Sequence, residues 1–159
     1  MEEENVFDEM SDQDTLSIEA PQSGTSEKYL LFLSDGLLFG VSAEHVVEII
    51  TNHVITTVPL VPNYIRGIIN LRGQIIPIVD IRLLLGQPQR EDTCIMILQL
   101  QDASLGILVD SVQRMIDLQE NTITSIPTQN AQKLVSGMCS LPDGQTMLVF
   151  DCDQLSSPT

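Results

Sequence analysis

Residues 65–81 read IRGIINLRGQIIPIVDI, which predicts a β-hairpin because two apolar arms rich in β-branched side chains flank a short polar centre. Arg72 stands beside the turn glycine Gly73 in that centre, so we expect its side chain at or near the hairpin tip. An arginine in an apolar hairpin must stay hydrated or meet a carboxylate. Glu48 is the candidate partner, and the pair is either a surface salt bridge or the charged rim of a docking surface.

The second half of the chain repeats this pattern. Residues 136–151 read SGMCSLPDGQTMLVFD, again two apolar arms around a turn, but this turn is plain and carries no arginine. Other features recur at a slowly growing offset, which is 66 residues between Gly40 and Gly106 (106 − 40) and 70 residues between Gly67 and Gly137 (137 − 67). Several aligned features at such an offset indicate an internal duplication of about 70 residues.

The duplication predicts an all-β fold made of two small barrels. Each half, roughly residues 28–90 and 91–159 with intertwined ends, offers about five short strands with tight turns and at most one short helix. We expect these helices over residues 43–50, where apolar side chains fall at helical spacing, and over the matching residues 110–116. Barrels avoid exposed sheet edges, and neither half is large enough to be comfortably stable alone. The predicted architecture is therefore two pseudo-symmetric five-stranded barrels on a shared apolar core, with a groove between them.

Charge is spread unevenly along the chain. The net charge is −15, and residues 1–27 hold nine acidic side chains and no basic one. Such a segment is typical of disorder, so we predict a disordered acidic tail over residues 1–27, either a solubilising arm or a docking peptide, and one folded domain over residues 28–159. The chain has no cluster of Lys and Arg to neutralise phosphates, which disfavours nucleic-acid binding. It has no apolar run of the roughly 18–20 residues that span a bilayer, and its acidic start does not resemble a secretory signal.

The cysteines and histidines predict neither a metal site nor a cofactor. Cys94, Cys139 and Cys152 form no CxxC pair and lie in apolar surroundings, which favours reduced, buried thiols. His45 and His53 stand far from them in the sequence.

The sequence also contains no nucleophile elbow, phosphate-binding loop, dinucleotide fingerprint or zinc-protease helix, so no catalytic residue is predicted. Asp80 and Asp151 close the two hairpins at equivalent positions, and we interpret both as strand-end or turn caps. Gly67 and Gly137 also match, and each indicates a bulge or a close backbone approach. For Gly67, which lies near Arg72, a contact with a partner protein stays open.

Residues 62–82 closely resemble the signature of the CheW family, the coupling proteins of bacterial chemosensory arrays. They combine a proline and an aromatic with the run I-x-G-I-I-N-L-R-G-x-I-I-P-I-V-D-I-R. The resemblance runs from about Tyr29 to Leu155 and implies two SH3-like five-stranded barrels around a shared core. The chain carries no kinase core and no receiver domain, so within the family it most resembles the stand-alone coupler.

The resemblance also implies a function. A protein of this family is a non-enzymatic scaffold that joins the cytoplasmic tips of methyl-accepting chemoreceptors to the regulatory domain of a CheA-type histidine kinase. It works in the cytoplasm at membrane-associated receptor arrays, without inserting into the membrane. The resemblance places kinase contacts on exposed barrel strands of both halves and implies no particular residue for them. The receptor-facing positions that the resemblance implies in this sequence are Val46, Glu48, Gly67, Arg72, Gly106 and Met115, with the last two expected to face the groove.

Two alternatives stay open. The first is an adaptor of the same fold in another chemosensory pathway, such as one for surface motility. The second is a small hydrolase or ligand-binding barrel that uses Asp80 or His45, although the sequence offers no convergent nucleophile and base for it.

Overall fold

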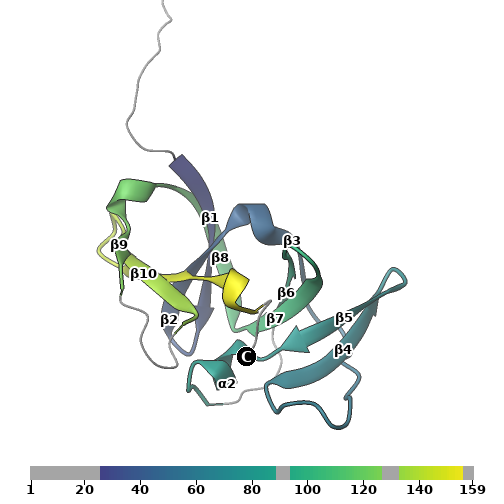
Figure 1. Ribbon diagram of the computed structural model, residues 1–159. Coiled ribbons are helices and arrows are strands. Elements are labelled where there is room, and N and C mark those ends of the chain that lie inside the picture. Colours follow the sequence, from purple (N-terminus) through teal and green to yellow (C-terminus); the bar gives the residue numbers. More distant parts are fainter. Residues whose placement is uncertain (1–25, 89–93, 127–132, 156–159) are drawn as a thin grey trace, which may run out of the picture.

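The computed structural model describes residues 26–88, 94–126 and 133–155, and it consists mainly of strands (Figure 1). The strands are, in chain order, β1 (Ser26–Ser34), β2 (Leu37–Ser42), β3 (Val46–Ile50), β4 (Ile65–Leu71), β5 (Gln74–Val79), β6 (Cys94–Gln99), β7 (Ser104–Val109), β8 (Ser111–Gln119), β9 (Thr124–Ser125), β10 (Val135–Ser140) and β11 (Thr146–Phe150). The short helical segments are η3 (Ala43–His45), α2 (Ile81–Leu84), η4 (Glu120–Thr122) and η5 (Cys152–Leu155). The predicted all-β class is confirmed.

Two residues that the prediction placed in the acidic tail belong to the first strand. Ser26 and Glu27 belong to β1 and lie opposite Gln119 and Leu118 of β8. The Glu27 carboxylate also accepts a hydrogen bond from the hydroxyl of Ser42. The rest of the predicted tail, residues 1–25, lies outside the described residues.

The predicted hairpin is formed by β4 and β5, with Arg72 at its tip. Leu71 pairs with Gln74, so Arg72 and Gly73 are the two central residues of the turn. Both have positive φ angles, 54° and 88°, as a two-residue turn that matches the twist of the strands requires. The Asn70 side chain supports the turn by accepting a hydrogen bond from the Gly73 amide at 2.9 Å.

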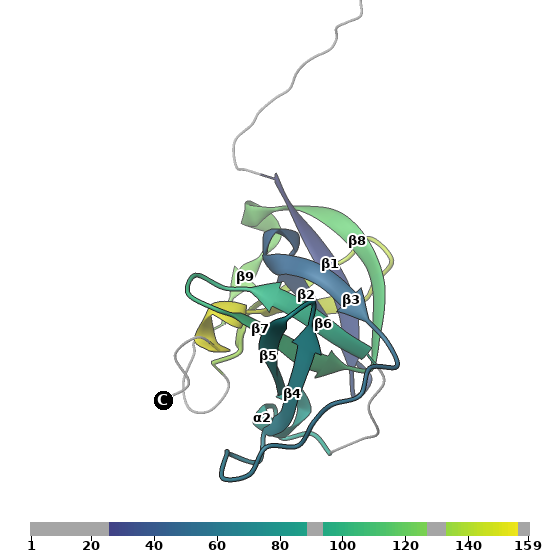
Figure 2. The same ribbon diagram turned by 90° about the vertical axis from the view of Figure 1, so that its right-hand side faces the viewer.

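The strands form two sheets with matching orders, β8-β1-β2-β11-β10-β9 and β3-β6-β7-β5-β4 (Figures 1 and 2). Each strand of the second sheet corresponds to one of the first under the duplication. Strand β9 also has a counterpart, the single residue Thr56. Thr124 of β9 pairs with Met138 of β10, and Thr56 forms the matching bridge with Ile68 of β4. The predicted halves of the chain each supply strands to both sheets. The β1–β2 hairpin joins β8 to β11, while the β6–β7 hairpin joins β3 to β5.

Two parallel strand pairs hold this exchange together. Phe39 of β2 lies opposite Leu148 of β11, and Gly106 of β7 lies opposite Ile78 of β5. Parallel neighbours require a crossover connection, and the exchange of hairpins between the two halves provides it. Neither half of the chain could therefore complete its own sheet alone.

The buried apolar side chains of the described residues form three clusters, one associated with each sheet and one shared between the sheets. The shared cluster contains Phe32, Phe39 and Phe150; the Phe32 ring stacks on Phe39 with centroids 5.4 Å apart and meets the edge of Phe150 at 5.7 Å. Strand β1 serves two clusters because its side chains alternate in direction. Leu31 packs in the cluster of the six-stranded sheet, and Leu30 packs in the shared cluster. The predicted shared core is confirmed.

The predicted helix over residues 43–50 is wrong. Only Ala43–His45 forms a single helical turn, and Val46–Ile50 is strand β3, paired with β6. The register shifts between Val46 and Glu48, so a bulge at Val47 interrupts the alternation of the strand and imitates helical spacing. The β-branched side chains of this segment favour a strand. The predicted counterpart helix over residues 110–116 is also wrong, because residues 111–116 belong to β8, which has a register shift of its own against β1.

Gly67 and Gly137 mark matching bulges where a neighbouring backbone comes close. The register of each hairpin shifts at these glycines. A Cβ atom on Gly67 would collide with the backbone oxygen of Thr56, and one on Gly137 would lie 2.8 Å from the backbone oxygen of Thr124. The close approach predicted for both glycines is confirmed.

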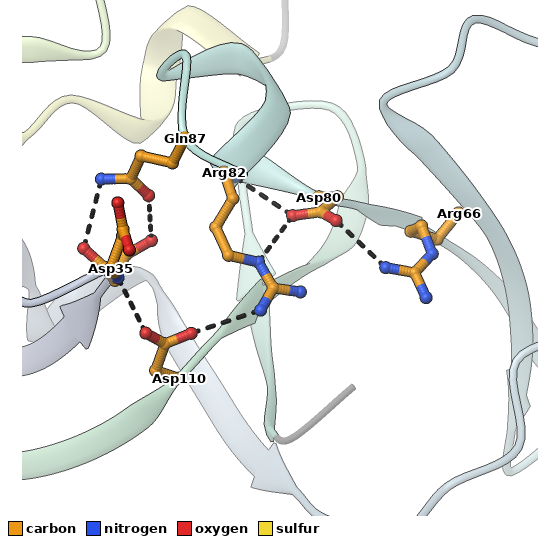
Figure 3. A network of polar contacts seen from close by, with 7 residues as sticks. Asp35, Arg66, Asp80, Arg82, Gln87 and Asp110 are labelled. Carbon is orange, nitrogen blue, oxygen red and sulfur yellow. Dashed lines mark hydrogen bonds and ion pairs between the residues drawn. The ribbon is translucent and has the colours of Figure 1, made fainter. Parts of the chain in front are cut away.

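A buried network of charged side chains connects the two sheets (Figure 3). Arg82 is fully buried; its Nε donates to Asp80 at 2.9 Å and its Nη1 donates to Asp110 at 3.2 Å. The Asp80 carboxylate also accepts a hydrogen bond from the backbone amide of Arg82, so Asp80 caps α2, in line with the predicted capping role. It accepts a further hydrogen bond from the Arg66 side chain. Asp110 accepts from the Asp35 amide in the β1–β2 turn at 2.7 Å. The network therefore joins α2 and the end of β7 to the other sheet.

We expect Arg82→Leu to lower the free energy of unfolding by about 3 kcal/mol, because it removes the buried cation that binds both Asp80 and Asp110 and leaves the fully buried Asp80 with Arg66 as its remaining cation. Lys28→Ala is the matched control, since it removes an exposed ion pair with Asp117 (3.0 Å) that is worth at most about 1 kcal/mol. Urea unfolding followed by circular dichroism measures both. Similar small losses in the two variants would contradict the role given to Arg82.

Candidate partner-binding surface

The guanidinium of Arg72 forms an ion pair with the carboxylate of Glu48. The pair joins the tip of the β4–β5 hairpin to β3, and it is the pair expected from the sequence. The Arg72 side chain remains 69% exposed and that of Glu48 31% exposed. An ion pair this accessible contributes little to stability, so both side chains remain available to a partner.

Val46 and Met115 lie at the rim of the shared core, on the edge strands of the two sheets. Val46 of β3 packs against the shared cluster. Met115 of β8 pairs with Leu30, a member of that cluster, and its side chain is 52% exposed. Adjacent residues of paired strands point to the same face of a sheet, so Met115 faces the side on which the two sheets meet.

Two exposed apolar residues of β3 were not predicted. Val47 is 54% exposed and Ile49 is 43% exposed, although the expected helix would have buried Val47. The bulge of β3 turns Val47 outward. Val46 and Ile49 lie opposite Leu98 and Met96 of the shared cluster, whereas Glu48 lies opposite Ile97 on the other face of the sheet. The edge strand β3 therefore offers aliphatic side chains on one face and the ion pair with Arg72 on the other. We call residues 46–49 and Arg72, together with Met115, the β3 surface.

Gly106 does not face a groove, contrary to the expectation from the sequence. It is buried in the five-stranded sheet, where a Cβ atom would lie 2.7 Å from Ile78 Cδ1 and 2.9 Å from Ile95 Cγ2. Gly67 is also buried, against the Thr56 backbone. Both glycines therefore shape the fold, and neither lies on the β3 surface.

The second barrel has an ion pair at the position that matches Glu48 and Arg72, but the strand carries the cation and the hairpin turn carries the anion. Arg114 of β8 meets Asp143 in the β10–β11 turn at 3.5 Å. These residues match Glu48 and Arg72 at offsets of 66 (114 − 48) and 71 (143 − 72). The turn that looked plain in the sequence thus places a carboxylate where the first hairpin has its arginine. The Arg114–Asp143 pair borders a cavity of about 420 Å³, whose lining includes Ile116, Leu118, Cys139 and Leu141.

A cluster of ionisable groups lies where η3 and η5 meet. A ring nitrogen of His45, the sulfur of Cys152 and a carboxylate oxygen of Asp153 lie within 4.8 Å of one another. Burial raises the pKa of the Cys152 thiol to about 12, and the negative charges of Asp153 and Asp151 act in the same direction. Sequence spacing gave no sign of this cluster, because the exchange of hairpins brings together residues from opposite ends of the domain.

Within residues 26–88, 94–126 and 133–155, no helix has both the length and the apolar composition needed to cross a membrane.

Comparison with known proteins identifies relatives over most of the chain. Residues 28–158 match the family model described as the CheW-like domain. The chain is 36% identical to the chemotaxis protein CheW of Bacillus subtilis over 106 residues, which cover 65% of this chain and 68% of that protein. It is 29% identical to the chemotaxis protein CheW of Klebsiella aerogenes over 138 residues, 82% of each chain. Among solved structures it is similar to the scaffolding protein TtCheW from Thermoanaerobacter tengcongensis, with a TM-score of 0.76 and 28% identity over 84% of this chain and 94% of that one.

We expect Gly106→Val to lower the free energy of unfolding by about 1–3 kcal/mol, because the new side chain overpacks the space between Ile78 and Ile95. Met115→Ala, at an exposed position, should change it by no more than about 0.5 kcal/mol. Urea unfolding of the two variants compares them directly. Equal effects would show that Gly106 is not enclosed as described.

Proposed function

We propose a coupling role for this chain, which belongs to the CheW-like domain family. In this proposal it is a non-enzymatic adaptor of bacterial chemotaxis that holds chemoreceptor tips and a CheA-type histidine kinase in one assembly. The support is that relatives named for chemotaxis and a solved scaffolding protein match most of the chain. The hydrolase alternative loses one of its candidates, because Asp80 is fully buried between Arg66 and Arg82.

The receptor-binding part of the proposal rests on the Glu48–Arg72 pair beside exposed aliphatic side chains. A helical partner binds such a surface with apolar anchors that pack on the aliphatic residues, while the charged rim fixes its orientation. The contacts we propose are made by Val46, Glu48, Arg72 and Met115, with Val47 and Ile49 beside them. Gly67 and Gly106 act indirectly by allowing the close packing beneath this surface.

The proposed kinase contact is with the regulatory domain, through strands of the sheets that the receptor leaves exposed. No residue is assigned to that contact. In this proposal the protein works in the cytoplasm and reaches the membrane only through the receptors that it binds.

Charge reversal tests the receptor surface. We expect Arg72→Glu to weaken binding to a cytoplasmic receptor fragment from the same source at least about tenfold, which corresponds to about 1.4 kcal/mol. Arg114→Glu is the matched control, because it breaks the corresponding exposed ion pair on the other barrel at a similar small cost to stability. Receptor affinity that is unchanged in Arg72→Glu, or lowered equally in both variants, would contradict the assignment of Arg72.

The exchanged pair Glu48→Arg with Arg72→Glu refines this test. The double variant keeps an ion pair between β3 and the hairpin tip but reverses its polarity. We expect receptor binding to remain weak if the receptor contacts the positive charge of Arg72 directly. Restored binding would instead show that the pair only holds the hairpin in position.

Titration calorimetry against the isolated regulatory domain of a CheA-type kinase from the same source tests the coupling role itself. We expect micromolar or tighter binding, equivalent to about −8 kcal/mol. Absence of binding to every cognate kinase would mean that the fold serves another purpose in this protein.

A further inference from the structure

The cluster at η3 and η5 is a consequence of sheet topology. Strands β2 and β11 are parallel neighbours, with Phe39 opposite Leu148. The segments that follow these strands, η3 and η5, therefore begin at the same end of the strands. His45 ends η3, and Cys152 and Asp153 begin η5. Residues far apart in the sequence are thus held side by side by the strands that precede them.

The five-stranded sheet has a corresponding group of charged residues at the matching end of its parallel strands. Its parallel neighbours are β5 and β7, and the residues that follow them are Asp80 and Arg82 on one side and Asp110 on the other. Here the positive guanidinium of Arg82 lies between two carboxylates. Arg66 also pairs with Asp80, so two negative and two positive charges are brought together, and each carboxylate has a cation beside it.

The six-stranded sheet lacks that guanidinium. At offsets of 71 (151 − 80 and 153 − 82) and 66 (110 − 44), the matching residues are Asp151, Asp153 and Glu44. All three are acidic; Asp151 and Asp153 flank Cys152 in the chain, and Glu44 Oε2 lies 3.9 Å from the Nε2 of His45. Where one barrel places an arginine between carboxylates, the other gathers carboxylates around a histidine and a cysteine. A cation bound here would correspond to the guanidinium of Arg82 in the other barrel.

We propose that His45, Cys152 and Asp153 bind one zinc ion, with Glu44 as the fourth ligand. The donors are a thiolate, an imidazole nitrogen and carboxylate oxygens, all of which zinc accepts. The ligand atoms of His45, Cys152 and Asp153 lie within 4.8 Å of one another, and Glu44 Oε2 lies 3.9 Å from His45 Nε2. Tetrahedral bonds of about 2.0–2.3 Å require separations of about 3.3–3.8 Å. The side chains must therefore close in by about 1 Å. Binding replaces the proton of the Cys152 thiol by the metal, and that proton passes to solvent.

The surroundings of His45 favour this role. Its Nδ1 lies 3.4 Å from the backbone oxygen of Gln99, an interaction that holds the ring when Nδ1 carries the proton. A histidine ligand commonly donates its second ring N–H to a carbonyl in this way. The other nitrogen, Nε2, lies 3.9 Å from Glu44 Oε2. The Asp153 side of the cluster is exposed and the Cys152 side is buried, so an ion can enter from solvent and meet the sulfur from outside.

Cobalt(II) added to the full-length, reduced, metal-free protein tests the proposal, since it occupies zinc sites and absorbs visible light. One equivalent should produce the strong bands of a tetrahedral site and a sulfur-to-cobalt charge-transfer band, and zinc should displace it. Cys152→Ser should abolish the charge-transfer band, while Cys139→Ser, a buried cysteine elsewhere, should leave it unchanged. His45→Ala should weaken zinc binding at least about tenfold, and His53→Ala should not weaken it.

Asp153→Asn keeps the test decisive if Cys152→Ser does not fold, because Asp153 is exposed and its replacement leaves the core intact. This variant should also weaken zinc binding at least about tenfold. The proposal is overturned if no thiolate band forms, if Cys139→Ser removes the band as fully as Cys152→Ser, or if zinc affinity is the same in His45→Ala, Asp153→Asn and the unmodified chain.

Discussion

The guanidinium of Arg82, enclosed by the carboxylates of Asp80 and Asp110, is the interaction on which the arrangement of the two sheets depends. Asp110 follows β7, the central strand of the five-stranded sheet, and directly precedes β8, the edge strand of the six-stranded sheet. Its second oxygen binds the Asp35 amide in the β1–β2 turn. A buried ion pair gains little over apolar packing but is costly to break. The network therefore acts mainly by requiring one relative position of the segments it joins.

The duplication explains why that position matters. Each half of the chain contributes a hairpin to the other half's sheet, so the sheets are completed only when both halves have folded. The shared cluster that contains Phe32, Phe39 and Phe150 is buried by the same event. The β3 surface is a product of this assembly as well, because Val46 and Met115 lie on strands of different sheets and both border the shared cluster.

Local signals in the sequence predicted the hairpins well, because turn chemistry and β-branched arms act within a few residues. The tip position of Arg72 and the cap at Asp80 followed from such signals. Glu48, which is 24 residues from Arg72, was only a candidate partner, because no local signal determines such a pair. The helix over residues 43–50 was predicted wrongly because a one-residue bulge in an edge strand imitates helical spacing. The burial of Gly106 and the cluster around Cys152 could not be predicted, since both depend on which strands become parallel neighbours after the exchange.

The opposed polarity of the two hairpin rims has a consequence for recognition. Pseudo-symmetry makes the two barrels similar in shape, so a partner that fitted one by shape alone could dock on both. Arg72 presents a cation at the first tip and Asp143 an anion at the second, each facing an ion-pair partner of opposite sign. A ligand whose charges suit one rim meets repulsion at the other. The internal repeat gives two hairpin tips of similar shape, and their opposite charges allow a partner to bind one of them selectively.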